Sequence, residues 1–165
     1  MIQTERLHLR KLTLDDAPFI LKHVNEPSFI ENIRDSGVRN LDDAEGYLTK
    51  GPLASYEKYG FGLCLMELRE SKTPIGMCGL LKRDTLDFPD IGYSLDPAFW
   101  KKGYASEAAA AVLDYGFGEL GMTRVLAITS PSNEASARLL LRLGMTDDGE
   151  VEYAGKPARI FSLVR

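Results

Sequence analysis

Cysteine, histidine and tryptophan are scarce in this chain of 165 residues, which has two cysteines, two histidines and one tryptophan. Cys64 and Cys78 lie in apolar, strand-like runs with no histidine or other base close by in sequence, which predicts buried packing rather than nucleophilic catalysis. So few potential ligands, without ligand-like spacing, also argue against a metal site. Because nothing points to export, we expect reduced thiols and a cytoplasmic protein.

Long apolar runs are also missing. No stretch approaches the roughly 18 residues that span a bilayer, and the N-terminus lacks the apolar segment of a secretory signal. We therefore expect no membrane association. The net charge of −4 argues against direct nucleic-acid binding, which needs a basic face, and would suit a cationic substrate or a basic protein partner. The length and the 44% hydrophobic content predict one globular domain over residues 1–165.

The standard phosphate-binding loops of nucleotide enzymes are absent too, since neither the Walker spacing nor G-x-G-x-x-G occurs at a suitable turn. The chain has instead Trp100-Lys-Lys-Gly-Tyr-Ala-Ser-Glu107, between an extended apolar run, Ile91 to Leu95, and an alanine run, Ala108 to Ala111. This order predicts a strand, a glycine turn and a helix start, whose free N–H groups bind anions. Gly103 would admit a phosphate close to the backbone. The alternative is an ordinary surface helix start.

Hydrophobic periodicity and turn residues divide the rest of the chain into strands and helices. We expect strands over 6–10, 61–68, 74–82, 90–95, 124–129, 145–153 and 158–164. We expect helices from Asp15, over 41–59 with an interruption at Gly51-Pro52, over 103–119 and over 133–143. Residues 25–40 are expected to be irregular. Gly76 and Gly79 inside a strand predict a bulge or a close backbone approach, and His8 is expected to face solvent.

The resulting order is β-α-α-β-β-β-α-β-α-β-β. It predicts an α/β fold of the mixed α+β kind, with a central, mostly antiparallel mixed sheet of six to seven strands and helices on both faces. No repeat, low-complexity tract or linker divides the chain.

This order and the loop resemble the GNAT superfamily of N-acetyltransferases. The family's loop reads Q/R-x-x-G-x-G/A, and here it reads Trp100-Lys-Lys-Gly-Tyr-Ala105, so tryptophan departs from the general rule. It is similar to the ribosomal-protein-alanine N-acetyltransferase (RimJ/RimL-like) branch, whose run is close to I-G-Y-x-L-x-P-x-W-x-K-G-Y-A-x-E-A. The chain has Ile91-Gly-Tyr-Ser-Leu-Asp-Pro-Ala-Phe-Trp-Lys-Lys-Gly-Tyr-Ala-Ser-Glu-Ala108, with one extra residue before the tryptophan.

Two further stretches carry the resemblance, which spans essentially the whole chain. Asn133-Glu-Ala-Ser136, followed by Leu143-Gly-Met145, is similar to the family's Asn-x-x-Ser/Ala motif and its later Leu-Gly-Phe. Thr4-Glu-Arg-Leu-His-Leu-Arg10 fits the first strand of the branch. Two motifs at the right separation support the resemblance more strongly than either motif alone.

The resemblance implies acetyl-coenzyme A (acetyl-CoA) as the cofactor. It implies that backbone N–H groups bind the pyrophosphate, from Lys101, Lys102, Gly103, Tyr104, Ala105 and Ser106. The backbone of Ser94 and Leu95 would pair with the pantetheine arm, and Asn133 and Ser136 would line the cofactor further along. Asn133 reads equally well as a helix cap, and Ser136 as a helix-surface hydroxyl.

The implied reaction is attack of an amine on the thioester carbonyl. The backbone N–H of Leu95 would stabilise the oxyanion. Asp90, at a strand start, is our candidate base, with a solvated strand-end charge as the alternative. Leu140 stands where some family members have a tyrosine acid, and packing explains Tyr93 and Tyr104 more simply.

The acceptor stays open between a protein N-terminal α-amine, such as that of a ribosomal protein, and a small amine such as a polyamine, an amino acid or an aminoglycoside. Four carboxylates could attract a cationic acceptor or simply be solvated: Glu31, Asp35, Asp84 and Asp87. A third reading is an acyl-CoA-binding sensor without catalysis. Both a monomer and a homodimer are compatible with the sequence.

Overall fold

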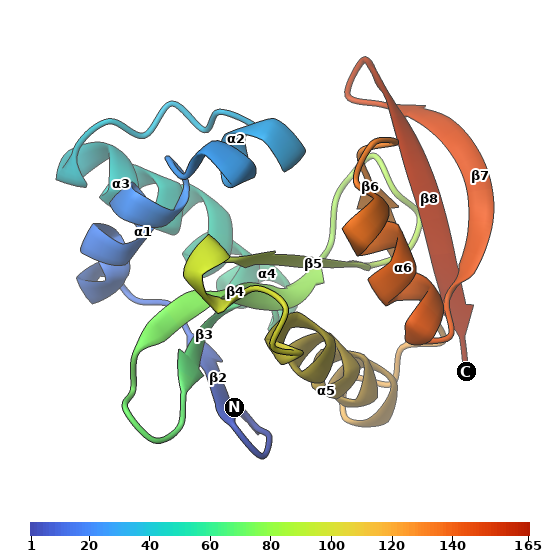
Figure 1. Cartoon of the computed structure of the whole chain (residues 1–165), viewed down its shortest axis with the longest axis horizontal. Helices are drawn as coiled ribbons and strands as arrows, with labels where there is room; N and C mark the ends of the chain where they lie inside the picture. Colours follow the sequence, from blue (N-terminus) through green and yellow to red (C-terminus); the bar gives the residue numbers. More distant parts are fainter.

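A computed structural model describes all residues, 1–165, and places a single twisted sheet between two groups of helices (Figure 1). The strands are β1 (Ile2–Gln3), β2 (Leu7–Lys11), β3 (Leu63–Leu68), β4 (Pro74–Leu81), β5 (Asp90–Leu95), β6 (Arg124–Thr129), β7 (Thr146–Tyr153) and β8 (Lys156–Val164). The α-helices are α1 (Ala17–His23), α2 (Pro27–Asn32), α3 (Leu41–Leu48), α4 (Ala54–Tyr59), α5 (Tyr104–Gly118) and α6 (Glu134–Arg142). Short helical turns are η1 (Leu14–Asp16), η2 (Thr49–Leu53) and η3 (Pro97–Phe99).

The sheet has eight strands in the order β1-β2-β3-β4-β5-β6-β8-β7. All neighbours are antiparallel except β5 and β6, which are parallel because α5 crosses over between them. This confirms the expected mixed, mostly antiparallel sheet. The strand beyond the expected count is β1, which is too short to show any alternation in sequence.

Each face of the sheet has its own apolar core. The larger core joins α5 and α6 to one face, with Ala108, Val112 and Leu140 among its fully buried members. The smaller core joins α1 and α3 to the other face, through Ile20, Leu48 and side chains of β3 and β4. None of the helices is both long and apolar enough to cross a membrane.

The segment between α1 and α3 corrects two expectations. Residues 25–40 are not wholly irregular, because Pro27 opens the short helix α2 and Phe29 buries its side chain. Six residues are too few for a helical period to stand out. The Gly51-Pro52 pair does interrupt the long helix, but as the π-helical turn η2, with Pro52 buried rather than exposed at a break.

Two glycines permit the close strand contacts that the sequence predicts. A Cβ at Gly76 would lie 2.2 Å from the carbonyl oxygen of Ser94, and a Cβ at Gly79 would lie 2.3 Å from that of Gly62. The expected bulge lies on the neighbouring strand, where the register shifts between Met66 and Glu67. Glycine at position 76 therefore lets β4 and the end of β5 approach each other.

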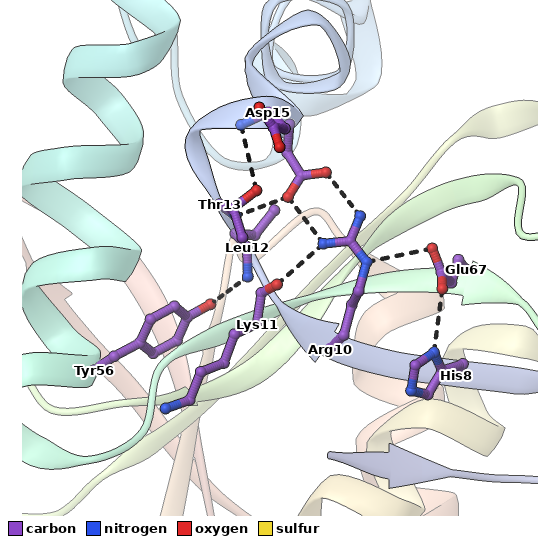
Figure 2. A network of polar contacts seen from close by, with 9 residues as sticks. His8, Arg10, Lys11, Leu12, Thr13, Asp15, Tyr56 and Glu67 are labelled. Carbon is purple, nitrogen blue, oxygen red and sulfur yellow. Dashed lines mark hydrogen bonds and ion pairs between the residues drawn. The ribbon is translucent and has the colours of Figure 1, made fainter.

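A polar network ties the first strands to the helices, as Figure 2 shows. His8 lies on the polar side of β2 as expected, with its side chain 29% exposed, and it pairs there with Glu67, whose Oε1 lies 3.1 Å from Nδ1. Arg10 contacts Glu67 at 3.5 Å and Asp16 at 2.8 Å. The hydroxyl of Tyr56 accepts from the N–H of Leu12 at 2.9 Å and donates to the carbonyl of Leu63. The alternation of residues 6–10 fixes which side His8 takes but not what covers it.

Candidate active site

Strands β5 and β6 separate almost as soon as they pair. Their only register pair is Asp90 with Leu126, supported by the Leu126 N–H donating to the Pro89 carbonyl at 2.8 Å. Beyond this point the strands diverge (Figure 1). The cleft that opens there, of about 1670 Å³, extends from α6 past the end of β5 to α1–α4.

The hydrogen-bond phase of β5 directs main-chain groups into this cleft. The Asp96 N–H donates to the Ile75 carbonyl at 2.8 Å, so Ser94 also directs its N–H and C=O towards β4. The N–H groups of Tyr93 and Leu95 therefore point away from β4, towards the gap left by β6. The Leu95 carbonyl is occupied by the indole N–H of Trp100, at 2.9 Å. Leu95 thus presents a free donor at the cleft.

The loop before α5 presents further free donors. Lys101 and Gly103 have φ angles of 62° and 83°, and the helix begins at Tyr104. The first helical bond into this turn is from the Glu107 N–H to the Gly103 carbonyl. No protein acceptor takes the main-chain N–H of any residue over 101–106. Consecutive free amides at a helix N-terminus form an anion site.

The loop is held in place by the first strands. The Glu107 carboxylate accepts from the main-chain N–H of Arg6 at 3.0 Å and from its Nε at 2.8 Å. Arg6 Nη1 donates to the Lys102 carbonyl at 2.9 Å, and its guanidinium lies 4.3 Å from the centre of the Tyr104 ring. Burial opposes ionisation of Glu107, but the hydrogen bonds from Thr4 and Arg6 lower its pKa below the ordinary value.

The N-terminus of α6 closes another side of the cleft. Asn133 Oδ1 accepts from the Ser136 N–H at 3.2 Å, which confirms Asn133 as a helix cap. The Ser136 hydroxyl lies 2.6 Å from the Tyr93 hydroxyl, so Tyr93 does more than pack. Burial raises the pKa of Tyr93 to about 12, so its proton stays on at neutral pH. Leu140 is fully buried in the core.

Asp90 is not the solvated charge of the alternative reading, because only 1% of its surface is exposed. Its Oδ1 lies 3.0 Å from Arg83 Nε, and Arg83 Nη1 donates to the Tyr153 hydroxyl at 3.3 Å. Burial raises the pKa of Asp90, and the nearby Arg83 only partly opposes this. The structure therefore holds a buried carboxylate with raised pKa on the wall of the cleft.

The sequence missed a second polar pair in the cleft, between His23 at the end of α1 and Ser94 on β5. His23 Nε2 lies 2.7 Å from Ser94 Oγ, and His23 is only 4% exposed. Burial lowers the pKa of His23 to about 4, so its ring is neutral at pH 7. The sequence showed no neighbour for His23 because 71 positions separate the two residues.

Most of the residues singled out in the sequence line this one cleft: Asp90, Ser94, Leu95, Lys101, Gly103, Tyr104, Ala105, Ser106, Asn133 and Ser136. Lys102 is the exception, because its ammonium lies over the Phe99 ring and its carbonyl faces Arg6. The four carboxylates expected to attract a cation, Glu31, Asp35, Asp84 and Asp87, do not line the cleft. Asp35 instead pairs with Arg39 at 2.7 Å.

Comparison with known proteins identifies the class of this fold and cleft. Residues 6–146 match the family described as the acetyltransferase (GNAT) domain, and the chain belongs to that family. It is therefore an N-acetyltransferase enzyme of the GNAT type, a family that uses acetyl-CoA. The open mixed sheet with flanking helices is the GNAT fold.

Individual proteins similar to this chain are also named acetyltransferases. The uncharacterized N-acetyltransferase YnaD of Bacillus subtilis is 30% identical over 148 residues, covering 90% of this chain and 84% of YnaD. The crystal structure of an acetyltransferase from Agrobacterium tumefaciens is 26% identical, with a TM-score of 0.85, and the match covers 99% of this chain and 94% of that one. RimL, a ribosomal α-N-protein acetyltransferase solved in complex with coenzyme A, shares the fold at 16% identity and a TM-score of 0.82, covering 98% and 95% of the two chains.

Proposed function

We propose that this enzyme binds acetyl-CoA in the cleft between β5 and β6 and acetylates the N-terminal α-amine of a protein, with ribosomal proteins as candidate acceptors. The observation that carries the cofactor site is the run of free main-chain amides over 101–106 at the start of α5. An anion at this place satisfies donors that the protein itself leaves without partners. Gly103 keeps the approach to them clear.

The remaining cofactor contacts follow from the same cleft. The free N–H groups of Tyr93 and Leu95 offer a strand edge along which the pantetheine amides can pair. Asn133 and Ser136 line the cleft on the α6 side. Acetyl-CoA, when bound, supplies the thioester that the amine attacks. The N–H of Leu95 is then the donor that stabilises charge on the carbonyl oxygen.

Asp90 is the group proposed to take the amine proton, through a chain of water molecules along the cleft, because it lies four residues, roughly 13 Å along the strand, from Ser94. A carboxylate whose pKa is raised by burial is a better base near neutral pH than an ordinary one. An α-amine, with a pKa of about 7.7–8.0, is far easier to deprotonate than a lysine at about 10.4. This pairing favours an N-terminal amine as the acceptor.

The cleft also favours a peptide over a polyamine. Basic residues outnumber acidic ones along its wall: Arg34, Lys50, Lys58, Lys82, Arg83, Lys101 and Lys156 against Glu26, Asp42, Asp43 and Asp90. A polycation gains little from such a wall, although the chain as a whole is acidic.

The test is the release of coenzyme A from acetyl-CoA with a panel of peptides, spermidine, free amino acids and an aminoglycoside. We expect turnover with peptides that have a free N-terminus and none when the same peptides are blocked at that end. Mass spectrometry should place the acetyl group on the α-nitrogen. Preferential turnover of spermidine or of an amino acid would refute the peptide proposal, and binding without turnover of any amine would indicate a sensor.

A further inference from the structure

We propose that His23 and Ser94 form a dyad that positions the attacking amine. In this dyad Nε2 of His23 accepts the Ser94 hydroxyl proton, and the lone pairs of Ser94 Oγ receive an N–H of the acceptor. The dyad rests on the proposed function for the identity of the acceptor, but its own geometry is independent of it. The two side chains come from opposite walls of the cleft, α1 and β5, and meet at 2.7 Å.

The position of Ser94 on β5 directs its hydroxyl towards α1, the side of the cleft on which the acceptor amine is proposed to bind. Side chains alternate along a strand, so Tyr93 and Leu95 face the core of α5 and α6, whereas Ser94 faces α1. Leu95, the next residue, directs its free N–H into the cleft. Ser94 and the residue that carries the proposed oxyanion donor are neighbours on β5, roughly 3.3 Å apart along the strand, with the hydroxyl on the α1 face of the sheet and the N–H at its open edge. An amine held by Ser94 lies beside the carbon that it must attack.

The imidazole of His23 is fixed in orientation. Phe19 stacks on it with ring centres 4.9 Å apart, and Phe29 meets it edge-on at 5.6 Å. Ser94 is the one residue whose polar group hydrogen-bonds the ring. The charged groups that act on the ring are Asp96, beyond the end of β5, and Lys22, its neighbour on α1. A ring clamped between two aromatic side chains can hold a hydroxyl in one direction.

A positioning role fits His23 better than that of a base. Burial lowers the pKa of His23 to about 4, so the ring is neutral at pH 7 and its Nε2 is available to accept the hydrogen bond from Ser94. A neutral imidazole offers one acceptor nitrogen, and a hydroxyl offers one proton and two acceptor sites. Once the Ser94 hydroxyl donates its hydrogen to Nε2 of His23, Ser94 Oγ can only accept further hydrogen bonds. It therefore selects a donor, and an amine N–H is that donor.

The kinetic test compares Ser94→Ala, His23→Phe and the double variant. The probes are a peptide with N-terminal alanine and hydroxylamine, a small amine that needs no acceptor pocket. At saturating acetyl-CoA we expect each single variant to lower kcat by about 10- to 100-fold, as loss of orientation does. The double variant should lose no more than the worse single one, because both remove the same device. Ser94→Thr should recover part of the rate.

Binding of acetyl-CoA, measured by calorimetry, should stay within about twofold in these variants. The matched control is His8→Gln, which alters the chain's other histidine outside the cleft and should keep wild-type kcat. A wild-type kcat in Ser94→Ala, or losses that multiply in the double variant, would overturn the dyad. If His23→Phe does not fold, His23→Gln replaces it.

A second measurement needs no acceptor. Nitrogen NMR of the wild-type protein should show His23 Nε2 without a proton and Nδ1 with one. A proton on Nε2 would overturn the proposal, because Ser94 would then keep its own proton for the cleft. If the wild-type enzyme acetylates neither amine, the proposed function fails, and the tautomer of His23 still decides the dyad.

Discussion

Glu107 on α5 and Arg6 in the turn before β2 are joined by two hydrogen bonds to one carboxylate, across 101 positions of sequence. A third bond, from Arg6 to the Lys102 carbonyl, extends this connection into the loop whose amides are free. The geometry of the proposed phosphate site therefore depends on the N-terminal strands as well as on α5. The contact with Arg6 gives Glu107, within the Ala-Ser-Glu-Ala run, a structural role.

Replacement of Glu107 by glutamine should weaken acetyl-CoA binding about 5- to 10-fold. The neutral amide loses the charge-assisted bond to Arg6, so the loop is held less firmly, at a cost of about 1–1.4 kcal/mol. Calorimetric titration with acetyl-CoA measures the change. The control is Asp114→Asn, a substitution on the same helix that removes the charge of an exposed pair with Arg165. Equal affinity in wild type and Glu107→Gln would show that the loop holds its shape without this contact.

Replacement of Gly103 by valine should weaken acetyl-CoA binding more strongly, by at least about tenfold. The φ angle of 83° is unfavourable for a β-branched residue, and the added Cβ would lie 3.3 Å from Arg6 Nη2. The side chain would also fill the space over the free amides. Titration calorimetry is again the measurement, with Gly118→Ala as the control, since that position has open space and lies in the same helix. Unchanged affinity would remove the phosphate from this loop.

Replacement of Asp90 by asparagine should lower kcat by about 10²- to 10⁴-fold and flatten the acid side of the pH–rate profile. In the wild type, the rate should fall with pH as the carboxylate, whose pKa is raised by burial, takes up its proton. Initial rates between pH 5 and 9 test this. Asp147→Asn serves as the control, because it removes an aspartate paired with arginine outside the cleft. If the profile stays in place, Asp90 is structural.

Replacement of His23 by phenylalanine should make the protein less sensitive to acid. Because the folded state holds the pKa of His23 at about 4 against an ordinary 6.5, the unfolded chain binds the proton more readily between these values. The stability is therefore complete above about pH 6.5 and falls as the pH drops towards 4, by about 3 kcal/mol in all. Urea unfolding at pH 7 and at pH 4.5 should show a smaller difference in the variant than in the wild type. An identical difference in both would mean that His23 does not carry this acid sensitivity.

The parts of the fold that sequence reasoning recovered are those with local signals. Helix α5 follows from its small residues at helical spacing, and the cap at Asn133 follows from its place before an amphipathic run. The shortest elements, β1 and α2, carry too few residues for a period to develop. Whether a glycine–proline pair ends a helix or only widens one turn, as at Pro52, depends on what packs against it.

The candidate site likewise has parts that the sequence predicts and parts that it does not. The free amides around Gly103 could be predicted because a loop and the helix after it are adjacent in sequence. Lys102 could not be placed, because its carbonyl accepts from Arg6, 96 positions away in sequence, and its ammonium lies over the Phe99 ring. The contacts of His23 with Ser94 and of Arg83 with Tyr153 join residues about 70 positions apart. No spacing rule connects such pairs, and only the folded sheet brings them together.

The early separation of β5 from β6 has a mechanical consequence. With one register pair at Asp90, β6 and the C-terminal hairpin share few main-chain hydrogen bonds with β5, and the apolar core around α5 and α6 holds the two parts of the sheet together. A ligand that pairs with the exposed edge at Leu95 would take the place of the absent strand residues and brace the two halves. Occupancy of the cleft should then slow amide hydrogen exchange on both sides of the gap, far beyond the atoms that the ligand touches.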